Sequence, residues 1–139
     1  RLYQALKDLG LEVGKPGGAF YVYPSFFPYA TQLNTLGVYT SADLSKWLIR
    51  ECGIAALPGS AFGEDDNGPA SGRFRLRMAT SYLYFRNEAD RYENGYSLLE
   101  AFAAGKEIQL PQLEKAIRLL EGAVNKLKAV STQLPLATL

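Results

Sequence analysis

Residues 73–79 read Arg-Phe-Arg-Leu-Arg-Met-Ala, a strict alternation of three arginines with three large apolar side chains. Successive side chains of an extended strand point to opposite faces of a sheet, so this period of two predicts a strand. Its apolar residues, Phe74, Leu76 and Met78, are expected to face a hydrophobic core. The guanidinium groups then share the opposite face.

The arginine face of this strand has two possible uses. An arginine is permanently charged, and its planar fork of N–H donors matches both oxygens of a carboxylate, so a strand-mounted arginine can hold an acidic ligand rigidly. The same face can also be the solvated side of an antiparallel sheet that buries only its other side. The alternation alone leaves both uses open.

Helical and extended patterns flank the arginine strand. In chain order we expect a helix over 1–9, a strand over 19–24, a long loop over 25–40, a helix over 41–52, a buried strand over 54–57, a polar turn region over 64–72, the strand over 73–79, and helices over 87–104 and 111–128. This order predicts an α+β fold, in which a small, largely antiparallel or mixed sheet of three to four strands carries helices mainly on one face.

The length and composition of the chain narrow its class. Its 139 residues suit a single domain, with residues 131–139 expected to fray as a tail. Fifteen basic and fourteen acidic side chains give a net charge of +1 without a run of like charges, so no nucleic-acid partner is expected. Because the sequence contains no histidine, Ser-His and Cys-His nucleophiles and imidazole metal sites are excluded, and no metal is expected.

The cysteine content, the apolar runs and the first residues bear on where the protein is located and on whether the sequence is complete. The single cysteine, Cys52, cannot form an internal disulfide, which fits a reducing compartment. The sequence has no apolar run of 18 residues and no signal-like N-terminus, so we expect a cytoplasmic protein that does not enter a membrane. The chain begins at Arg1 inside a helical pattern, and its only methionine is Met78, so we expect a piece of a longer protein.

Three segments carry a resemblance to a known family. Residues 16–21 read Pro-Gly-Gly-Ala-Phe-Tyr, residues 52–63 read Cys-Gly-Ile-Ala-Ala-Leu-Pro-Gly-Ser-Ala-Phe-Gly, and residues 74–81 read Phe-Arg-Leu-Arg-Met-Ala-Thr-Ser. In this order, and with a helix between the first two, they resemble the C-terminal small domain of fold type I, class I and II pyridoxal phosphate-dependent aminotransferases. The resemblance implies transfer of an amino group between an amino acid and a 2-oxo acid.

The resemblance also implies roles for individual residues. Arg75, followed four residues later by Ala79, matches the family's arginine that grips the substrate α-carboxylate. Gly17 and Gly18 either border the substrate pocket, where a missing Cβ allows close approach, or form a plain turn. Ser60 is a candidate for contact with the substrate region, although a structural role for its loop is the simpler interpretation.

The resemblance assigns no substrate-binding role to the two neighbouring arginines, Arg73 and Arg77. We expect them to be solvated or to pair with acidic residues of the preceding turn region. The candidate partners are Glu64, Asp65 and Asp66.

The resemblance places the rest of the chemistry outside this chain. In the family, a lysine that binds pyridoxal 5'-phosphate, an acid at its ring nitrogen and the phosphate-binding groups belong to a large domain, here expected upstream of Arg1. No catalytic or cofactor-binding residue is therefore assigned in this chain, and the chain alone is expected to bind no cofactor and to be inactive. The full-length enzyme is expected to be a homodimer.

Residues 82–109 form an insertion-like segment relative to many family members, and the sequence leaves open whether they are a surface addition or a subunit contact. Two readings compete with the aminotransferase. In one, the three-arginine face makes a free-standing module for small anions. In the other, exposed aromatic residues such as Phe26, Phe27 and Tyr29 mark a domain used only for oligomerisation.

Overall fold

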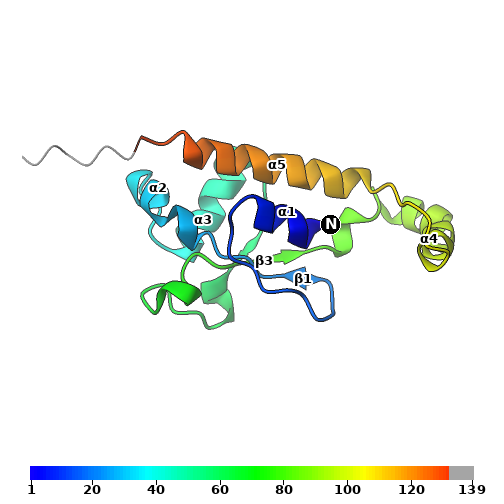
Figure 1. Ribbon diagram of the computed structural model, residues 1–139, viewed down its shortest axis with the longest axis horizontal. Helices are drawn as coiled ribbons and strands as arrows, with labels where there is room; N and C mark the ends of the chain where they lie inside the picture. Colours follow the sequence, from blue (N-terminus) through cyan, green and yellow to red (C-terminus); the bar gives the residue numbers. More distant parts are fainter. Residues whose placement is uncertain (132–139) are drawn as a thin grey trace, which may run out of the picture.

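A three-stranded antiparallel sheet lies at the centre of the protein, which we describe from a computed structural model over residues 1–131 (Figure 1). The strands are β1 (Tyr21–Val22), β2 (Leu57–Pro58) and β3 (Leu76–Ala79), in the spatial order β1-β3-β2. Tyr21 pairs with Ala79 on one side of β3, and Leu57 pairs with Arg77 on the other. The expected α+β class with a small antiparallel sheet is confirmed.

Helices surround this sheet mainly on one side (Figure 1). The α-helices are α1 (Leu2–Asp8), α2 (Ala30–Thr35), α3 (Ser41–Trp47), α4 (Glu88–Ala103) and α5 (Pro111–Lys128). Single turns of other helix types are the 3-10 turns η1 (Phe27–Tyr29), η3 (Gly59–Phe62), η4 (Ala70–Gly72) and η5 (Ser81–Leu83), and the π-helical turn η2 (Leu48–Cys52).

The central strand follows the predicted alternation with one exception. Phe74, Leu76 and Met78 are buried, whereas the arginines between them are partly exposed. The regular strand nevertheless begins at Leu76 rather than at residue 73, because Phe74 has a φ of +55°, in the left-handed region that breaks an extended chain. Arg75 joins the sheet through an isolated bridge to Ser25, and Arg73 lies before the break.

Helix α5 covers the sheet and α1, and its apolar stripe has the predicted helical spacing (Figure 1). Ile117, Val124 and Leu127 are almost fully buried in the core. Pro111 occupies the first turn, where its missing N–H is tolerated, and Lys126 near the other end donates to the Glu51 carbonyl. The predicted helix over 111–128 is confirmed.

Helix α3 is fixed at both ends by the residues that predicted it. The Thr40 side chain accepts a hydrogen bond from the Asp43 N–H at 3.0 Å, as an N-cap residue does. Gly53, with a φ of +68°, ends the helical stretch in the left-handed conformation. The helix expected over 41–52 is therefore present, with its last five residues wound as the π-helical turn η2.

Two predictions on the flanking segments are wrong. The long loop expected over 25–40 contains η1 and α2, because Pro28 sits in the first turn of η1 rather than breaking a helix, and Leu33 of α2 is fully buried. The buried strand expected over 54–57 is instead β2 at Leu57–Pro58, and 49% of Leu57 is exposed. Since β2 is an edge strand, Pro58 can be accommodated there without loss of a ladder hydrogen bond.

Helix α4 stands apart from the other helices (Figure 1). The predicted helix over 87–104 is confirmed, with the Asn87 side chain accepting from the Asp90 N–H at its start. The structure describes all residues of α4, and none of them is buried by contacts within residues 1–131. The expected frayed tail, 131–139, lies outside the described residues except for Ser131.

No helix within residues 1–131 combines the length and apolar character needed to cross a membrane. In the same part of the chain, no three acidic or cysteine side chains gather in a group that could hold a metal ion.

Candidate functional site

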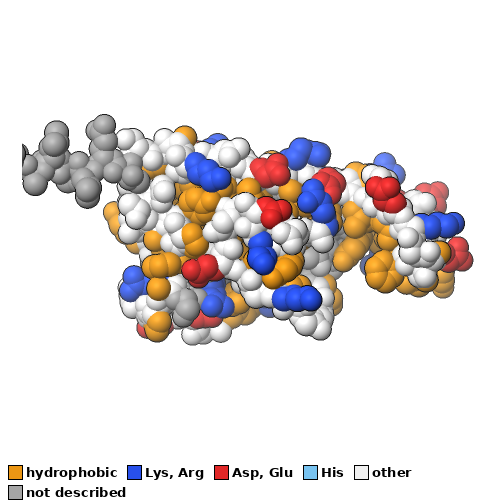
Figure 2. Space-filling view, viewed as in Figure 1, with side chains coloured by type: hydrophobic (Ala, Val, Ile, Leu, Met, Phe, Trp, Pro, Cys, Tyr) orange, Lys and Arg blue, Asp and Glu red, His pale blue; other side chains and the backbone are white. Residues whose placement is uncertain are grey.

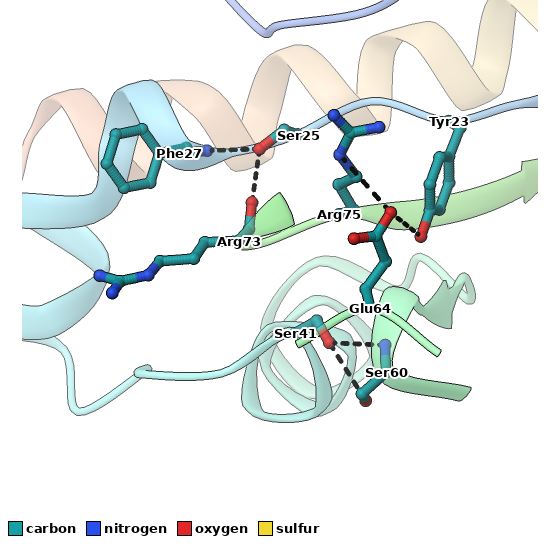
Figure 3. Close-up of polar contacts among 8 residues, drawn as sticks. All are labelled: Tyr23, Ser25, Phe27, Ser41, Ser60, Glu64, Arg73 and Arg75. Carbon is teal, nitrogen blue, oxygen red and sulfur yellow. Dashed lines mark hydrogen bonds and ion pairs between the residues drawn. The ribbon is translucent and has the colours of Figure 1, made fainter. Parts of the chain in front are cut away.

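The backbone of Arg75 is held by the segments on both of its edges in the sheet. Its carbonyl accepts a hydrogen bond from the Gly59 N–H at 2.8 Å. On the opposite edge, an isolated antiparallel β-bridge joins Arg75 to Ser25. The Ser25 hydroxyl also donates to the Arg73 carbonyl at 2.6 Å, which ties down the chain just before Arg75 (Figure 3). Arg75 therefore starts from a rigid backbone position, as a residue that orients a ligand must.

The side chain of Arg75 lies beside an aromatic ring and a carboxylate. Its guanidinium carbon is 5.3 Å from the centre of the Tyr23 ring, within cation–π range, and its Nε is 4.0 Å from Oε1 of Glu64. The Tyr23 hydroxyl donates to the same carboxylate oxygen at 3.3 Å, so Glu64 reaches both neighbours (Figure 3). We call Arg75, Tyr23, Glu64 and Gly59 the Arg75 site.

The Arg75 site is half-open to solvent. About one third of each charged side chain is exposed, 32% for Arg75 and 31% for Glu64. Partial burial raises the pKa of Tyr23 above its ordinary 10.0, and the nearby negative charge of Glu64 and the hydrogen bond to it raise this pKa further. Tyr23 is therefore a neutral hydrogen-bond donor at physiological pH.

Gly59 is a close-packed position that the sequence alone did not single out. A Cβ at residue 59 would lie 2.8 Å from the Tyr23 hydroxyl oxygen, 3.1 Å from the Arg75 Cβ and 3.2 Å from the Arg75 carbonyl oxygen. All three contacts are with residues of the Arg75 site itself. The missing side chain at Gly59 is thus what lets β2 and the following turn approach Arg75.

Ser60 lies next to Gly59 but serves to anchor its loop. The Ser60 N–H donates to the buried hydroxyl of Ser41 at 3.2 Å, and the two hydroxyl oxygens are 3.2 Å apart (Figure 3). The Ser41 N–H in turn donates to Asp66 at 2.9 Å. The first turn of α3 thereby holds both ends of the segment that carries Glu64.

The three arginines do not form one shared face. The Arg73 side chain donates to the carbonyls of Gly68 at 2.8 Å and Asn67 at 3.3 Å, and it points away from Arg75 (Figure 3). The Arg77 guanidinium carbon lies 4.0 Å from the centre of the Phe62 ring and 4.5 Å from that of Tyr21.

Glu64 lies beside Arg75, with its Oε1 4.0 Å from the Arg75 Nε. Of the partners expected for Arg73 and Arg77 if they were not solvated, Glu64 contacts the neighbouring Arg75 instead, and Arg73 donates to carbonyls of its own loop.

Gly17 and Gly18 lie in the loop before β1, away from Arg75. Since Tyr21 pairs with Ala79, this loop adjoins the end of β3 opposite to Arg75. A Cβ on either glycine would meet no atom within 4 Å among residues 1–131. The structure thus places Ser60 next to Gly59, which contacts Arg75, and leaves Gly17 and Gly18 apart from Arg75.

Two further members of the Arg75 site, Tyr23 and Glu64, had only weak signals in the sequence. Tyr23 lies in the aromatic run that predicted β1, and the period of two would have placed it on the same side of the sheet as Tyr21. Glu64 belongs to the polar turn region, where spacing carries no information about contacts.

Arg75 thus lies partly exposed just before the central strand of a small α+β sheet. The sequence profile of the family described as aminotransferase class I and II matches residues 1–82. The chain therefore belongs to the class I and II aminotransferase family.

Individual relatives agree with this assignment. The chain is 37% identical over 92 residues to a probable N-acetyl-LL-diaminopimelate aminotransferase of Bacillus subtilis (strain 168), a match that covers 66% of this chain and 20% of the relative. It is 33% identical over 92 residues to an aspartate aminotransferase of Pyrococcus abyssi, covering 66% of this chain and 21% of that protein. The chain thus spans about a fifth of the length of these relatives.

Solved structures show the same fold. An aromatic aminotransferase from Pyrococcus horikoshii OT3 superimposes with a TM-score of 0.55 at 24% sequence identity. That match covers 91% of this chain and 23% of the other. The small α+β fold therefore occurs within a larger aminotransferase structure.

Proposed function

We propose that this chain is the small domain of a pyridoxal phosphate-dependent aminotransferase and that Arg75 binds the α-carboxylate of the amino acid and of the 2-oxo acid. One observation carries the proposal. In a segment matched by the family profile, Arg75 is fixed on the sheet by hydrogen-bonded neighbours while its side chain remains partly exposed.

The charge and shape of Arg75 suit this task. A hydrogen bond to a charged group contributes about 1.5–3 kcal/mol, and two parallel N–H donors also fix the plane of the carboxylate. Fixing that plane sets the direction of the bonds at the substrate Cα, which is the atom that reacts. Arg75 therefore acts by orienting the substrate rather than by moving a proton.

Glu64 gives Arg75 an internal competitor for the substrate. Its carboxylate has the same charge as the ligand and lies 4.0 Å from the Arg75 Nε. A substrate carboxylate that binds Arg75 must share or displace this contact. Because both side chains are about one third exposed, water screens the pair and the competition is modest.

The bound cofactor would supply an aldehyde carbon that accepts the amino group and a ring that withdraws electrons from the substrate Cα. The residues of this chain do not suit its attachment, because all seven lysines, which fall within residues 1–131, have exposed side chains. We therefore assign the cofactor lysine and the phosphate-binding groups to a large domain upstream of Arg1. On this proposal the chain alone is inactive, and the homodimer and the cytoplasmic location stay predictions.

The competing anion-binding module needs a shared arginine face, and that face is not assembled here. Arg73 is turned toward loop carbonyls and Arg77 toward two aromatic rings, so the three positive charges do not converge. The competing oligomerisation domain was expected to expose Phe26, Phe27 and Tyr29, and this expectation is wrong, because Phe26 and Tyr29 are buried in the core and Phe27 packs against it.

The proposal is tested on the complete protein. We expect its reading frame upstream of Arg1 to encode a large α/β domain with a cofactor-binding lysine. We expect the purified protein to absorb light as a pyridoxal phosphate enzyme and to transfer amino groups from a panel of amino acids to 2-oxoglutarate. A complete protein without such a domain, or one that transfers no amino group from any donor, would contradict it.

A further inference from the structure

Arg77 lies on the same side of the sheet as Arg75. In β3, Leu76 and Met78 are buried in the core, so the residues that alternate with them project to the opposite face. Arg75 shares this alternation, because it joins the sheet through its bridge to Ser25 and is only partly buried. Two steps along an extended strand separate the Cα atoms of the two arginines by roughly 6–7 Å. The face that carries Arg75 therefore continues directly to a second guanidinium.

Two aromatic rings hold Arg77 in place. Its guanidinium carbon lies 4.0 Å from the centre of the Phe62 ring in η3 and 4.5 Å from that of Tyr21 in β1. The two rings come from segments on the two sides of β3. Such contacts restrain a long side chain by its charge and its flat shape. They leave its five N–H donors without a conventional acceptor, because ring carbons offer no lone pair.

The N–H donors of Arg77 differ in this respect from those of its neighbours. Arg73 donates to two loop carbonyls, and Arg75 lies beside Glu64. Among residues 1–131, no carboxylate, carbonyl or hydroxyl oxygen pairs with the Arg77 side chain. A half-buried cation beside aromatic rings gains more from an anion than a cation in open water does. Arg77 is thus positioned for a negative charge that the described part of the chain does not supply.

The placement of the two arginines suits two small anionic groups on one ligand. Arg75 lies against Tyr23 and Arg77 between its own two rings, so the guanidiniums are anchored at separate points. On the face seen in Figure 2, basic and acidic side chains are interspersed, a distribution that does not favour a polyanion. A short dicarboxylate fits the arrangement, because each planar guanidinium can take one carboxylate.

We propose that Arg77 is a second carboxylate-binding group, which binds the side-chain carboxylate of a dicarboxylic amino acid or 2-oxo acid while Arg75 binds its α-carboxylate. This inference rests on the proposed function, because it takes Arg75 as the site of the α-carboxylate. Arg77 then determines specificity, since an acidic substrate contacts both arginines whereas a neutral side chain leaves the Arg77 donors unpaired. Phe62 and Tyr21 are positioning residues that act through Arg77.

The test compares two ligands of the same size that differ in one charge, glutarate and its monoamide. Each is titrated calorimetrically at neutral pH into the full-length protein loaded with pyridoxal 5'-phosphate, so the readout is binding rather than amino-group transfer. We expect glutarate to bind about tenfold more tightly, because a hydrogen bond between two charged groups is stronger than one to a neutral amide. Equal affinities in the unchanged protein would overturn the inference without any variant.

Two variants locate the source of the preference. Arg77→Leu should abolish it, while continued binding of the monoamide through its single carboxylate shows that the variant is folded and that Arg75 still binds. Arg73→Leu removes the same charge from a residue that donates to loop carbonyls, and it should keep the full preference for glutarate. This control separates a local contact from the general attraction of a dianion to a basic protein.

The other outcomes refute distinct claims. A preference that survives in Arg77→Leu, or that Arg73→Leu also removes, would refute the second carboxylate site. Tighter binding of 3-phenylpropionate than of glutarate would refute it as well, and would indicate that the Phe62 and Tyr21 rings receive an apolar side chain. A protein that transfers amino groups but binds glutarate and the monoamide alike refutes only the role of Arg77. One that keeps the glutarate preference but transfers no amino group refutes only the aminotransferase.

Discussion

The Arg75 site and α4 differ in how their side chains find partners. At the Arg75 site, each side chain touches another residue of the same domain, and Gly59 is packed so closely that a single added carbon would collide with Tyr23. Along α4, by contrast, large side chains such as Tyr96 and Phe102 stand more than 70% exposed. The side chains of the first region contact one another within this chain, whereas no residue of α4 is buried by contacts among residues 1–131.

The sequence carries different information about the Arg75 site and about α4. Residues of the Arg75 site lie within the stretch matched by the family profile, and their spacing reflects contacts made inside the domain. Helix α4 lies beyond that stretch, and its apolar spacing forms a helix whose packing partner is not among residues 1–131. A periodic pattern thus predicts an element in both regions, but only in the first does it also predict what the element packs against.

Loss of Arg75 itself is expected to have the largest effect on catalysis. In the full-length enzyme, Arg75→Leu should lower kcat/KM about 10- to 150-fold in both the amino-acid and the 2-oxo-acid half-reactions, because it removes a charge-assisted hydrogen bond to each substrate. Single-turnover absorbance of the cofactor measures both halves separately.

Arg73→Leu is the matched control for Arg75→Leu. Arg73 lies two residues away and donates to the loop carbonyls of Gly68 and Asn67, so the half-reactions should change little. Equal losses in the two variants would show that the wrong arginine has been assigned.

Gly59→Ala should destabilise the protein by about 1–3 kcal/mol, because the new Cβ overpacks Tyr23 and Arg75. Gly122→Ala in α5, where a Cβ would meet nothing within 4 Å among the described residues, should instead stabilise it by about 0.5–1 kcal/mol. Urea unfolding of both variants measures the difference. Two variants of equal stability would show that the Arg75 site is as loosely packed as the surface.

A smaller effect is expected when the internal competitor of the substrate is neutralised. Glu64→Gln should lower KM for the carboxylate substrates by up to about fivefold and leave kcat nearly unchanged, since a half-exposed ion pair contributes at most about 1 kcal/mol. A higher KM in this variant would mean that Glu64 positions Arg75 for the substrate rather than competing with it.

The pH dependence of stability should show the smallest effect. The pKa of Tyr23 is raised in the folded protein, so folding favours its protonated form. This contribution is complete below pH 10.0, the ordinary pKa, and is lost as the pH rises through the folded-state value. Between pH 9 and 11 the melting temperature should therefore fall less steeply for Tyr23→Phe than for the unchanged protein. Parallel curves of melting temperature against pH would contradict the raised pKa of Tyr23.

The sequence predicted most of the secondary structure because its strongest signals are local. Thr40 and Gly53 bracket a helix by capping chemistry, and the alternation around Leu76 describes a half-buried strand. The six-residue helix α2 was missed, since so short an element is stabilised by burial of Leu33 in the core rather than by its own pattern.

The candidate site was predictable in its centre and not in its surroundings. Arg75 could be named because the matching segment covers it, and its solvent-accessible position follows from the period of two. The contacts with Gly59 and Glu64 join segments that are distant in the sequence, and no spacing rule links them. The break at Phe74, which turns Arg73 away from Arg75, is likewise a property of the folded backbone.

The most direct test of the account is a measurement of coupling between Arg75 and the substrate carboxylate. The best amino-acid donor and the amine that lacks its carboxylate are compared in the first half-reaction, with the unchanged enzyme, Arg75→Leu and Arg73→Leu. We predict that the preference for the amino acid over the amine disappears in Arg75→Leu and persists in Arg73→Leu. A preference that survives in Arg75→Leu would show that another residue holds the carboxylate.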